Sequence, residues 1–275
     1  MIHRSEKMKE IKEAYQQCGQ IVSECAPACF KAFSFLPLKQ RQAAWAVLSF
    51  CHTAANADEN ALSAIEAEAE QVFSGTYNGN HFLWKAFSHA YQTFTLDSEP
   101  FREFFAAQKA EDKPFESLDE LLMHAYQTGG AAGLMLLPIL TRRNQDQLKQ
   151  AAVSLGLAIQ LIRTLRDLGT SQQQKNRIPR QVMQQFGYTE DDLQKGTVNK
   201  PFIMTWEYIA FEAEAYLEEC QDALPLCPQY SQKTVKAALH LHRAVLEKIR
   251  SAQHDVFRQQ YEVTENEAKG ILSDI

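Results

Sequence analysis

Apolar residues recur at helical spacing along almost the whole chain. Between residues 148 and 168 they fall at i, i+3, i+4 and i+7, which places them on one face of a helix, and residues 38–50, 202–224 and 231–261 show the same pattern. The alternation of apolar and polar residues that is typical of strands is nearly absent, and Pro and Gly number only 9 and 11. The pattern therefore predicts an all-α fold.

Short clusters of Pro, Gly and polar residues interrupt this periodicity and predict roughly eight to ten helices with short connections. No repeat, low-complexity linker or shift in composition marks a domain boundary, so we expect a single domain over residues 1–275. The longest polar, non-periodic stretch is 169–179. Because long irregular loops in compact domains are often functional, this stretch is a candidate ligand flap.

The charge balance excludes some classes of partner. The formal net charge is -6, from 28 Lys and Arg against 34 Asp and Glu, whereas a nucleic-acid-binding protein usually needs a net basic face. The first 20 residues are charged and lack the apolar core of a signal peptide. The longest apolar run, 133–140, is far shorter than the roughly 18–20 residues that cross a bilayer. We therefore expect a cytoplasmic protein with no nucleic-acid partner and no transmembrane segment.

The six cysteines are expected to be reduced, since cysteine is a common buried residue in a large chain without a secretion signal. Cys25 and Cys29 are four residues apart but lack a second Cys or His pair at ligand spacing, which argues against zinc. His240 and His242 are two residues apart on an expected helix and point to nearly opposite sides. A metal shared between these two histidines is therefore not expected.

Charged and polar side chains cluster in the otherwise apolar segment 155–169. Gln160, Arg163 and Asp167 share one helical face, with Arg166 at its edge. Such groups are costly in an apolar helix unless they pair with each other or meet a ligand. The segment fits either an Arg–Asp pair that closes the end of the helix or a binding site for an anion.

Two further segments combine helical periodicity with unusual residues. In 45–59, His52, Asn56 and Glu59 align at i, i+4 and i+7, although an ordinary helix end with a solvated acidic tip would look the same. In 126–138, three glycines lie within a helical pattern, at a cost of roughly 1 kcal/mol each relative to Ala. They fit either a close approach of two helices or room for a long apolar ligand.

Taken together, these segments resemble the squalene/phytoene synthase family, most closely the bacterial dehydrosqualene synthases. The resemblance runs over nearly the whole chain and rests on three separated motifs. They are the FSFLPLKQRQAAWAV segment that starts at Phe33, the Tyr126…Gly130…Gly133…Pro138 helix, and the Leu155-Gly-x-Ala-x-Gln…Leu165-Arg-Asp-x-Gly169 segment followed by Arg177-Ile178. It implies a single-domain, all-α isoprenoid-synthase fold with helices around a central apolar cavity.

The chain departs from the family pattern where that family holds Mg²⁺ against its substrate diphosphates. Mg²⁺ prefers carboxylate and phosphate oxygens. The first aspartate-rich motif of the family falls on Ala-Asn-Ala-Asp-Glu at 55–59, and in the second motif Asp167 is kept while its partner is Ser171. Arg163 stands where the family has Asn, and His52 where it has Arg. Coupling of two prenyl diphosphates is therefore expected to be compromised, while binding of one is still feasible.

The leading hypothesis is a prenyl diphosphate hydrolase that converts farnesyl diphosphate to farnesol. Here the resemblance implies a catalytic group, a magnesium site and a pocket for the substrate. The catalytic group would consist of Arg163, Arg166 and Asp167, and Mg²⁺ would be bound by Asp167 and Glu59 with help from Asn56. Arg177 would help Arg163 and Arg166 to hold the diphosphate. The substrate would be contacted by His52, Asn56, Tyr126, Gly129, Gly130, Gly133, Leu137 and Gln160.

Two alternatives remain open. The chain could keep the head-to-head synthesis of a C30 hydrocarbon, as a squalene or dehydrosqualene synthase does. It could also bind an isoprenoid without turnover. The expected partner is a small prenyl diphosphate. For a hydrolase or a synthase, a transient membrane contact would serve the release of an apolar product.

Overall fold

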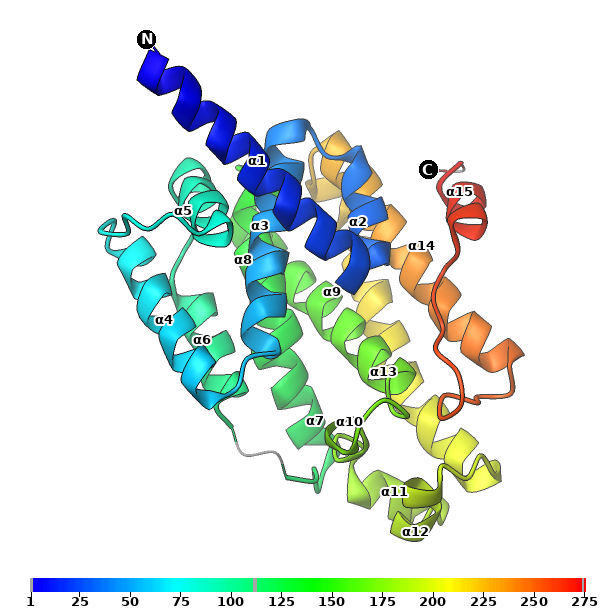
Figure 1. Ribbon diagram of the computed structural model, residues 1–275. Coiled ribbons are helices and arrows are strands. Elements are labelled where there is room, and N and C mark those ends of the chain that lie inside the picture. The colour runs from blue at the N-terminus through cyan, green and yellow to red at the C-terminus, as the bar shows by residue number, and fades with distance from the viewer. Residues whose placement is uncertain (1, 111–112, 274) are drawn as a thin grey trace.

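The computed structural model describes residues 2–110, 113–273 and 275, and every regular element within them is helical (Figure 1). The elements are α1 (Ile2–Cys25), α2 (Pro27–Ala32), η1 (Phe33–Phe35), α3 (Leu38–Ala55), α4 (Glu59–Phe73), α5 (Phe82–Phe94), α6 (Glu99–Gln108), α7 (Leu118–Ala125), η2 (Tyr126–Gly130), α8 (Ala131–Leu140), α9 (Gln145–Arg166), α10 (Gln172–Lys175), α11 (Arg180–Phe186), α12 (Glu190–Lys195), α13 (Lys200–Asp222), η3 (Leu224–Leu226), α14 (Gln229–Ser251) and α15 (Glu265–Ser273). The all-α prediction is confirmed.

The helices α8 and α9 cross the middle of the molecule, with α4 to α6 on one side and α13 to α15 on the other (Figure 1). The short helices α10, α11 and α12 lie with α7 at one end. None of the helices in the described residues is both long enough and apolar enough to cross a membrane.

Local capping explains where several helices begin. Asn199 accepts a hydrogen bond from the amide of Phe202 at 2.9 Å, and Pro201 follows within the first turn of α13, where its missing amide proton costs nothing. At α12, Thr189 and Asp192 form a reciprocal capping box. Each of these signals satisfies amides that an isolated helix start would leave without a partner.

One local prediction is wrong. His52, Asn56 and Glu59 do not lie on one continuous helix, because α3 ends at Ala55 and Glu59 begins α4. Asp58 accepts a hydrogen bond from the amide of Ala61 and so caps the new helix. Glu59 is therefore the first residue of α4 and not part of the end of α3. Only His52 and Asn56 keep the expected spacing of four residues.

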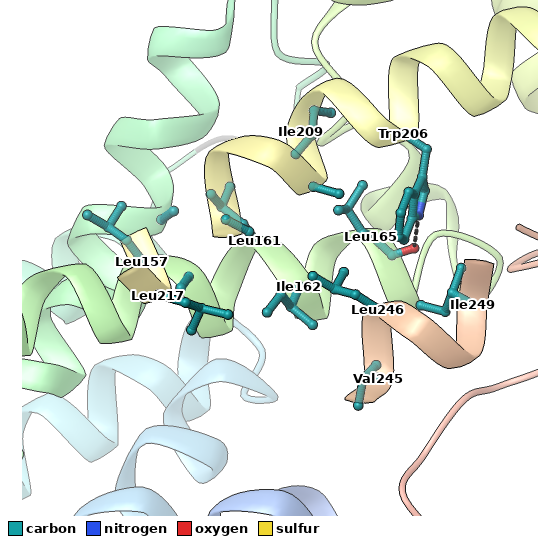
Figure 2. Close-up of a cluster of buried hydrophobic side chains, with 14 of the residues drawn as sticks. Leu157, Leu161, Ile162, Leu165, Trp206, Ile209, Leu217, Val245, Leu246 and Ile249 are labelled. Atoms are coloured by element: carbon teal, nitrogen blue, oxygen red, sulfur yellow. Dashed lines mark hydrogen bonds between the residues drawn. The ribbon is translucent and has the colours of Figure 1, made fainter. Parts of the chain in front are cut away.

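The buried apolar residues form two clusters. In the C-terminal half, α9, α13 and α14 meet through Leu161, Leu165, Ile209 and Leu246, and the indole of Trp206 donates a hydrogen bond to the carbonyl of Leu165 (Figure 2). In the N-terminal half, α3, α5 and α6 pack through aromatic rings around Phe50. Phe87, Phe101 and Phe105 lie with their ring centroids 4.9, 5.4 and 5.5 Å from that of Phe50.

Between the two clusters, η2 and α8 cross α9 at backbone contact. A methyl group on Gly129 would lie closer than 3.0 Å to the carbonyl oxygen of Gly156, and one on Gly133 would lie equally close to that of Ala152. The close helix approach that the sequence left open for these glycines is therefore one role that the structure shows. The turn Tyr126–Gly130 is π-helical, which the sequence did not predict.

Candidate active site

A cavity of about 300 Å³ lies where this crossing meets α2, α3 and α14. Its walls are mostly apolar, and many of its side chains are small. The apolar lining includes Ala28, Ala32, Phe33, Leu48, Ala132, Leu136, Leu140, Ala152, Leu155, Ile159, Val235, Ala238 and Val245. A pocket of this volume is at the small end of the range of roughly 300–1,000 Å³ for sites that hold small molecules.

Three arginines supply the positive charge of the cavity wall. Arg163 and Arg166 come from the last turn of α9, and Arg177 comes from the segment after α10. Arg177 also donates a hydrogen bond to Gln174, which itself lines the cavity. Guanidinium groups hold phosphate oxygens through paired hydrogen bonds, so this wall can bind a diphosphate while the apolar walls bury a hydrocarbon chain.

Arg177 and Gln174 belong to the polar stretch 169–179, the candidate ligand flap. Backbone hydrogen bonds join the end of this stretch to the segment before α7: the amide of Phe115 donates to the carbonyl of Asn176 at 2.8 Å, and the amide of Arg180, the next residue after the stretch, donates to the carbonyl of Phe115 at 3.0 Å. These bonds hold the backbone next to Arg177 against the segment before α7.

The arginines and the apolar surroundings of the cavity lower the pKa values of two histidines in its wall. Burial, reinforced by the positive charge of Arg177, lowers the pKa of His124 to about 4. Burial and the charge of Arg163 likewise lower the pKa of His52 below its ordinary value. Both imidazoles line the cavity, and both are therefore neutral near pH 7.

Asp167 is bound to Arg166 rather than held open for another ligand. It ends α9, and both its carboxylate oxygens accept hydrogen bonds from the Arg166 guanidinium, at 2.6 and 2.8 Å. Arg163 lies 3.7 Å from the same carboxylate. The Arg–Asp pair and the anion site that the sequence offered as alternatives coexist, because Arg166 pairs with Asp167 and still lines the cavity.

The residues predicted to hold Mg²⁺ do not fit that ion as they stand. Both oxygens of Asp167 accept hydrogen bonds from Arg166, and Glu59 is exposed at the start of α4. Within residues 2–110, 113–273 and 275, no group of three or more His, Cys, Asp or Glu side chains is arranged around a metal position. We therefore derive no step through Mg²⁺, and its involvement stays a prediction.

The structure gathers most of the predicted substrate-contacting residues around the cavity. His52, Asn56, Gly129, Gly133, Gln160, Arg163, Arg166 and Arg177 line it. Tyr126, Gly130, Leu137, Glu59 and Asp167 are not among the lining residues. Leu137 is buried in the other direction, since the side chains that face the cavity from α8 recur at Ala132, Leu136 and Leu140. The functional roles of all these residues stay predictions.

Several lining residues were missed or set aside by the sequence reasoning. His124 gave no signal of its own in the sequence. His242 was considered only as half of a metal pair with His240, and the structure indeed separates the two, with His240 exposed and His242 buried in the cavity wall. The helical spacing of Ala132, Leu136 and Leu140 could have found the apolar lining residues of α8.

Residues 23–267 match the model of the squalene/phytoene synthase family. The chain belongs to this family. In agreement, a solved dehydrosqualene synthase with a bound ligand superposes with a TM-score of 0.90 at 26% identity, over 98% of this chain and 97% of that one. The predicted isoprenoid-synthase fold is thereby confirmed.

A more similar member of the family is the farnesyl diphosphate phosphatase YisP of Bacillus subtilis (strain 168). It is 80% identical over 268 residues, which cover 98% of this chain and all of the relative. The crystal structure of YisP superposes with a TM-score of 0.88 and covers 99% of this chain. By comparison, the 15-cis-phytoene synthase of Synechococcus elongatus is 26% identical over 93% of this chain and 90% of its own length.

Proposed function

We propose that this protein hydrolyses farnesyl diphosphate to farnesol. The observation that carries the proposal is an apolar cavity with Arg163, Arg166 and Arg177 in its polar wall. In the part of the chain that the structure describes, no cluster of acidic side chains is placed to hold a metal ion. The 80% identity to a farnesyl diphosphate phosphatase supports the same activity.

The cavity accounts for substrate binding. Each methylene group of a prenyl chain that leaves water contributes about 0.8 kcal/mol, so a C15 chain is held mainly by the apolar walls. The arginines hold the diphosphate and stabilise the negative charge that develops on the leaving phosphate. Since the cavity measures only about 300 Å³, it suits one prenyl chain better than the two that a coupling reaction needs.

Water is the expected second reactant when no second prenyl chain is held nearby. It can attack C1 of the ionised substrate and give farnesol with pyrophosphate, or attack phosphorus and give farnesol with phosphate in two steps. In both routes the arginines stay in place, and only the bond that breaks differs.

A product assay in ¹⁸O-labelled water tests the proposal. The enzyme is incubated with farnesyl diphosphate in Mg²⁺ or in EDTA, and both the organic extract and the released phosphates are analysed by mass spectrometry. Farnesol supports the proposal; label in farnesol indicates cleavage of the carbon–oxygen bond, and label in phosphate indicates cleavage at phosphorus. A C30 hydrocarbon in the extract would show that the protein is a squalene or dehydrosqualene synthase. Binding of farnesyl diphosphate without any product would show that it binds an isoprenoid without turnover.

The proposed reaction converts a charged amphiphile into an uncharged, apolar alcohol. A cytoplasmic enzyme would therefore need an apolar acceptor for its product. We include a transient contact with a membrane during product release in the proposal, to be tested by the effect of lipid vesicles on the turnover rate.

A further inference from the structure

His242 faces the cavity from α14. The side chains of this helix that line the cavity are Val235, Ala238, His242 and Val245, at spacings of three, four and three residues, so they share one helical face. His242 is 8% exposed and is the titratable residue of this set. Its placement brings an imidazole into the same cavity that holds the arginines.

A hydrogen bond within α14 fixes the tautomer of this imidazole. The Nδ1 atom of His242 lies 2.8 Å from the carbonyl oxygen of Ala238. Because a carbonyl can only accept, Nδ1 carries the proton, and the neutral ring then presents an unprotonated Nε2. Burial, together with the positive charge of Arg166, lowers the pKa of His242 to about 4, so the ring is neutral at physiological pH.

The other candidate bases in or beside the cavity are less suitable. Glu262 lines the cavity, but this residue is exposed and its carboxylate interacts with the charge of Arg166. Asp167 has both oxygens engaged by Arg166. His52 has its Nδ1 within 3.2 Å of the Asn56 amide nitrogen. The Nε2 of His124 is enclosed by protein, and its ring packs 5.5 Å from that of Phe115. Nε2 of His242 is not among the enclosed atoms, and the described residues offer it no hydrogen-bond partner.

We propose that Nε2 of His242 is the general base that takes a proton from the attacking water while Arg166 and its neighbours hold the diphosphate. The inference rests on the proposed hydrolysis. The water oxygen forms its new bond to C1 or to phosphorus, and the bond from that atom to the leaving oxygen breaks with its electron pair. One water proton passes to Nε2, which returns it to the leaving oxygen. That oxygen belongs to a phosphate after attack at C1 or at the terminal phosphorus, and to farnesol in the last step of the phosphorus route.

The decisive variant is His242→Asn. The amide of Asn can keep the hydrogen bond to the Ala238 carbonyl, because its nitrogen occupies nearly the position of Nδ1, but it has nothing at the position of Nε2. We expect the kcat for farnesyl diphosphate to fall by about 10²-fold, the lower end of the usual contribution of a general base, because the lowered pKa makes this imidazole a weak base. Binding of farnesyl thiodiphosphate, measured by calorimetry, and the thermal midpoint should change little.

The matched control is His240→Asn, two residues away on the exposed side of the same helix, which should leave kcat unchanged. A second variant, His242→Ala, leaves space beside the cavity, and added imidazole should restore part of its activity in proportion to the concentration of the neutral base. A residue with a purely structural role would not respond in this way.

The outcomes separate the inference from the function on which it rests. If the unmodified protein makes no farnesol, the proposed function itself fails. If the unmodified protein is active and His242→Asn keeps its kcat, the assignment of His242 is overturned. It is also overturned if the variant loses analogue binding together with activity, or if imidazole does not rescue His242→Ala.

Discussion

Gly129 and Gly156 meet backbone to backbone where the π-helical turn crosses α9, and a methyl group on either one would lie closer than 3.0 Å to the carbonyl oxygen of the other. The same two glycines line the cavity. The crossing therefore sets the distance between the π-helical turn and α9 at the wall of the cavity.

We expect Gly156→Ala to destabilise the protein strongly, because the obstacle is a backbone carbonyl on a packed helix and cannot rotate away. The free energy of unfolding should fall by at least about 1–3 kcal/mol, the usual cost of overpacking. Urea denaturation followed by circular dichroism measures it. Gly270→Ala is the control: nothing lies within 4 Å of the new methyl, and in helix α15 it should be neutral or stabilising. Equal stability of both variants would contradict the crossing.

Arg163→Gln tests the diphosphate-binding wall. This guanidinium lines the cavity beside His52, and its loss removes charge-assisted hydrogen bonds to phosphate. Such bonds are worth about 1.5–3 kcal/mol, so kcat/KM for farnesyl diphosphate should fall by about 10–100-fold. Arg142→Gln, on an exposed turn outside the cavity, should have no effect. A similar loss in both variants would indicate a long-range effect of charge instead of binding.

Chelation separates an arginine-based site from a magnesium-based one. Because both oxygens of Asp167 are occupied by Arg166, we expect farnesol production to persist in EDTA. The assay is product formation over a titration of Mg²⁺ after chelation. Complete loss of activity, restored by Mg²⁺, would show that the reaction needs the ion and would contradict a site that works through arginines alone.

Asp167→Asn tests the ion pair itself. The side chain of Asp167 is mostly buried, and the substitution leaves Arg166 without its charged partner, so the free energy of unfolding should fall by about 1–3 kcal/mol. Thermal unfolding measures the change. Asp146→Asn serves as the control, since its carboxylate pairs with Lys149 on the surface and is almost fully exposed. An unchanged midpoint for Asp167→Asn would mean that the pair adds nothing to stability.

The histidines predict how stability depends on pH. The pKa of His242 is about 4 in the folded protein and 6.5 in an ordinary environment, and the charged group that acts on it is Arg166. Between these values the unfolded chain binds more protons than the folded one, so stability decreases as pH falls from about 6.5 toward 4. The full effect is about 3 kcal/mol for this residue.

Urea denaturation at pH 7 and pH 4.5 measures this effect. His124, whose pKa is also about 4 next to Arg177, contributes in the same direction. The variant His242→Asn should therefore show a smaller decrease than the unmodified protein, while His240→Asn should match it. If His242→Asn showed the full decrease, the imidazole would not be buried in its neutral form.

The sequence was sufficient to predict the all-α class and the family. It underestimated the number of helices, because the described residues hold fifteen α-helices where eight to ten were expected. Apolar residues at helical spacing between 148 and 168 predicted a helix there, and the structure has α9 at Gln145–Arg166. The single buried face that the spacing suggested is too narrow, because α9 packs against η2, α8, α13 and α14 and is buried on several sides. The isoprenoid-synthase fold was implied by the resemblance of the motifs around Gly133, Gln160 and Arg166 to the squalene/phytoene synthase family, and the departures from that family's pattern at 55–59 predicted the loss of its first carboxylate cluster.

Only the tertiary structure decided which groups meet. Glu59 does not share a helix with His52, because Asp58 caps the start of a new helix. The spacing of apolar residues is the same for one continuous helix and for two helices with a break, so it could not distinguish them. Asp167 turned out to be engaged because a carboxylate at the end of α9 can fold back onto Arg166. His242 joined the cavity because α14 packs on α9 with that face inward, and packing between residues 80 positions apart leaves no trace in a single sequence.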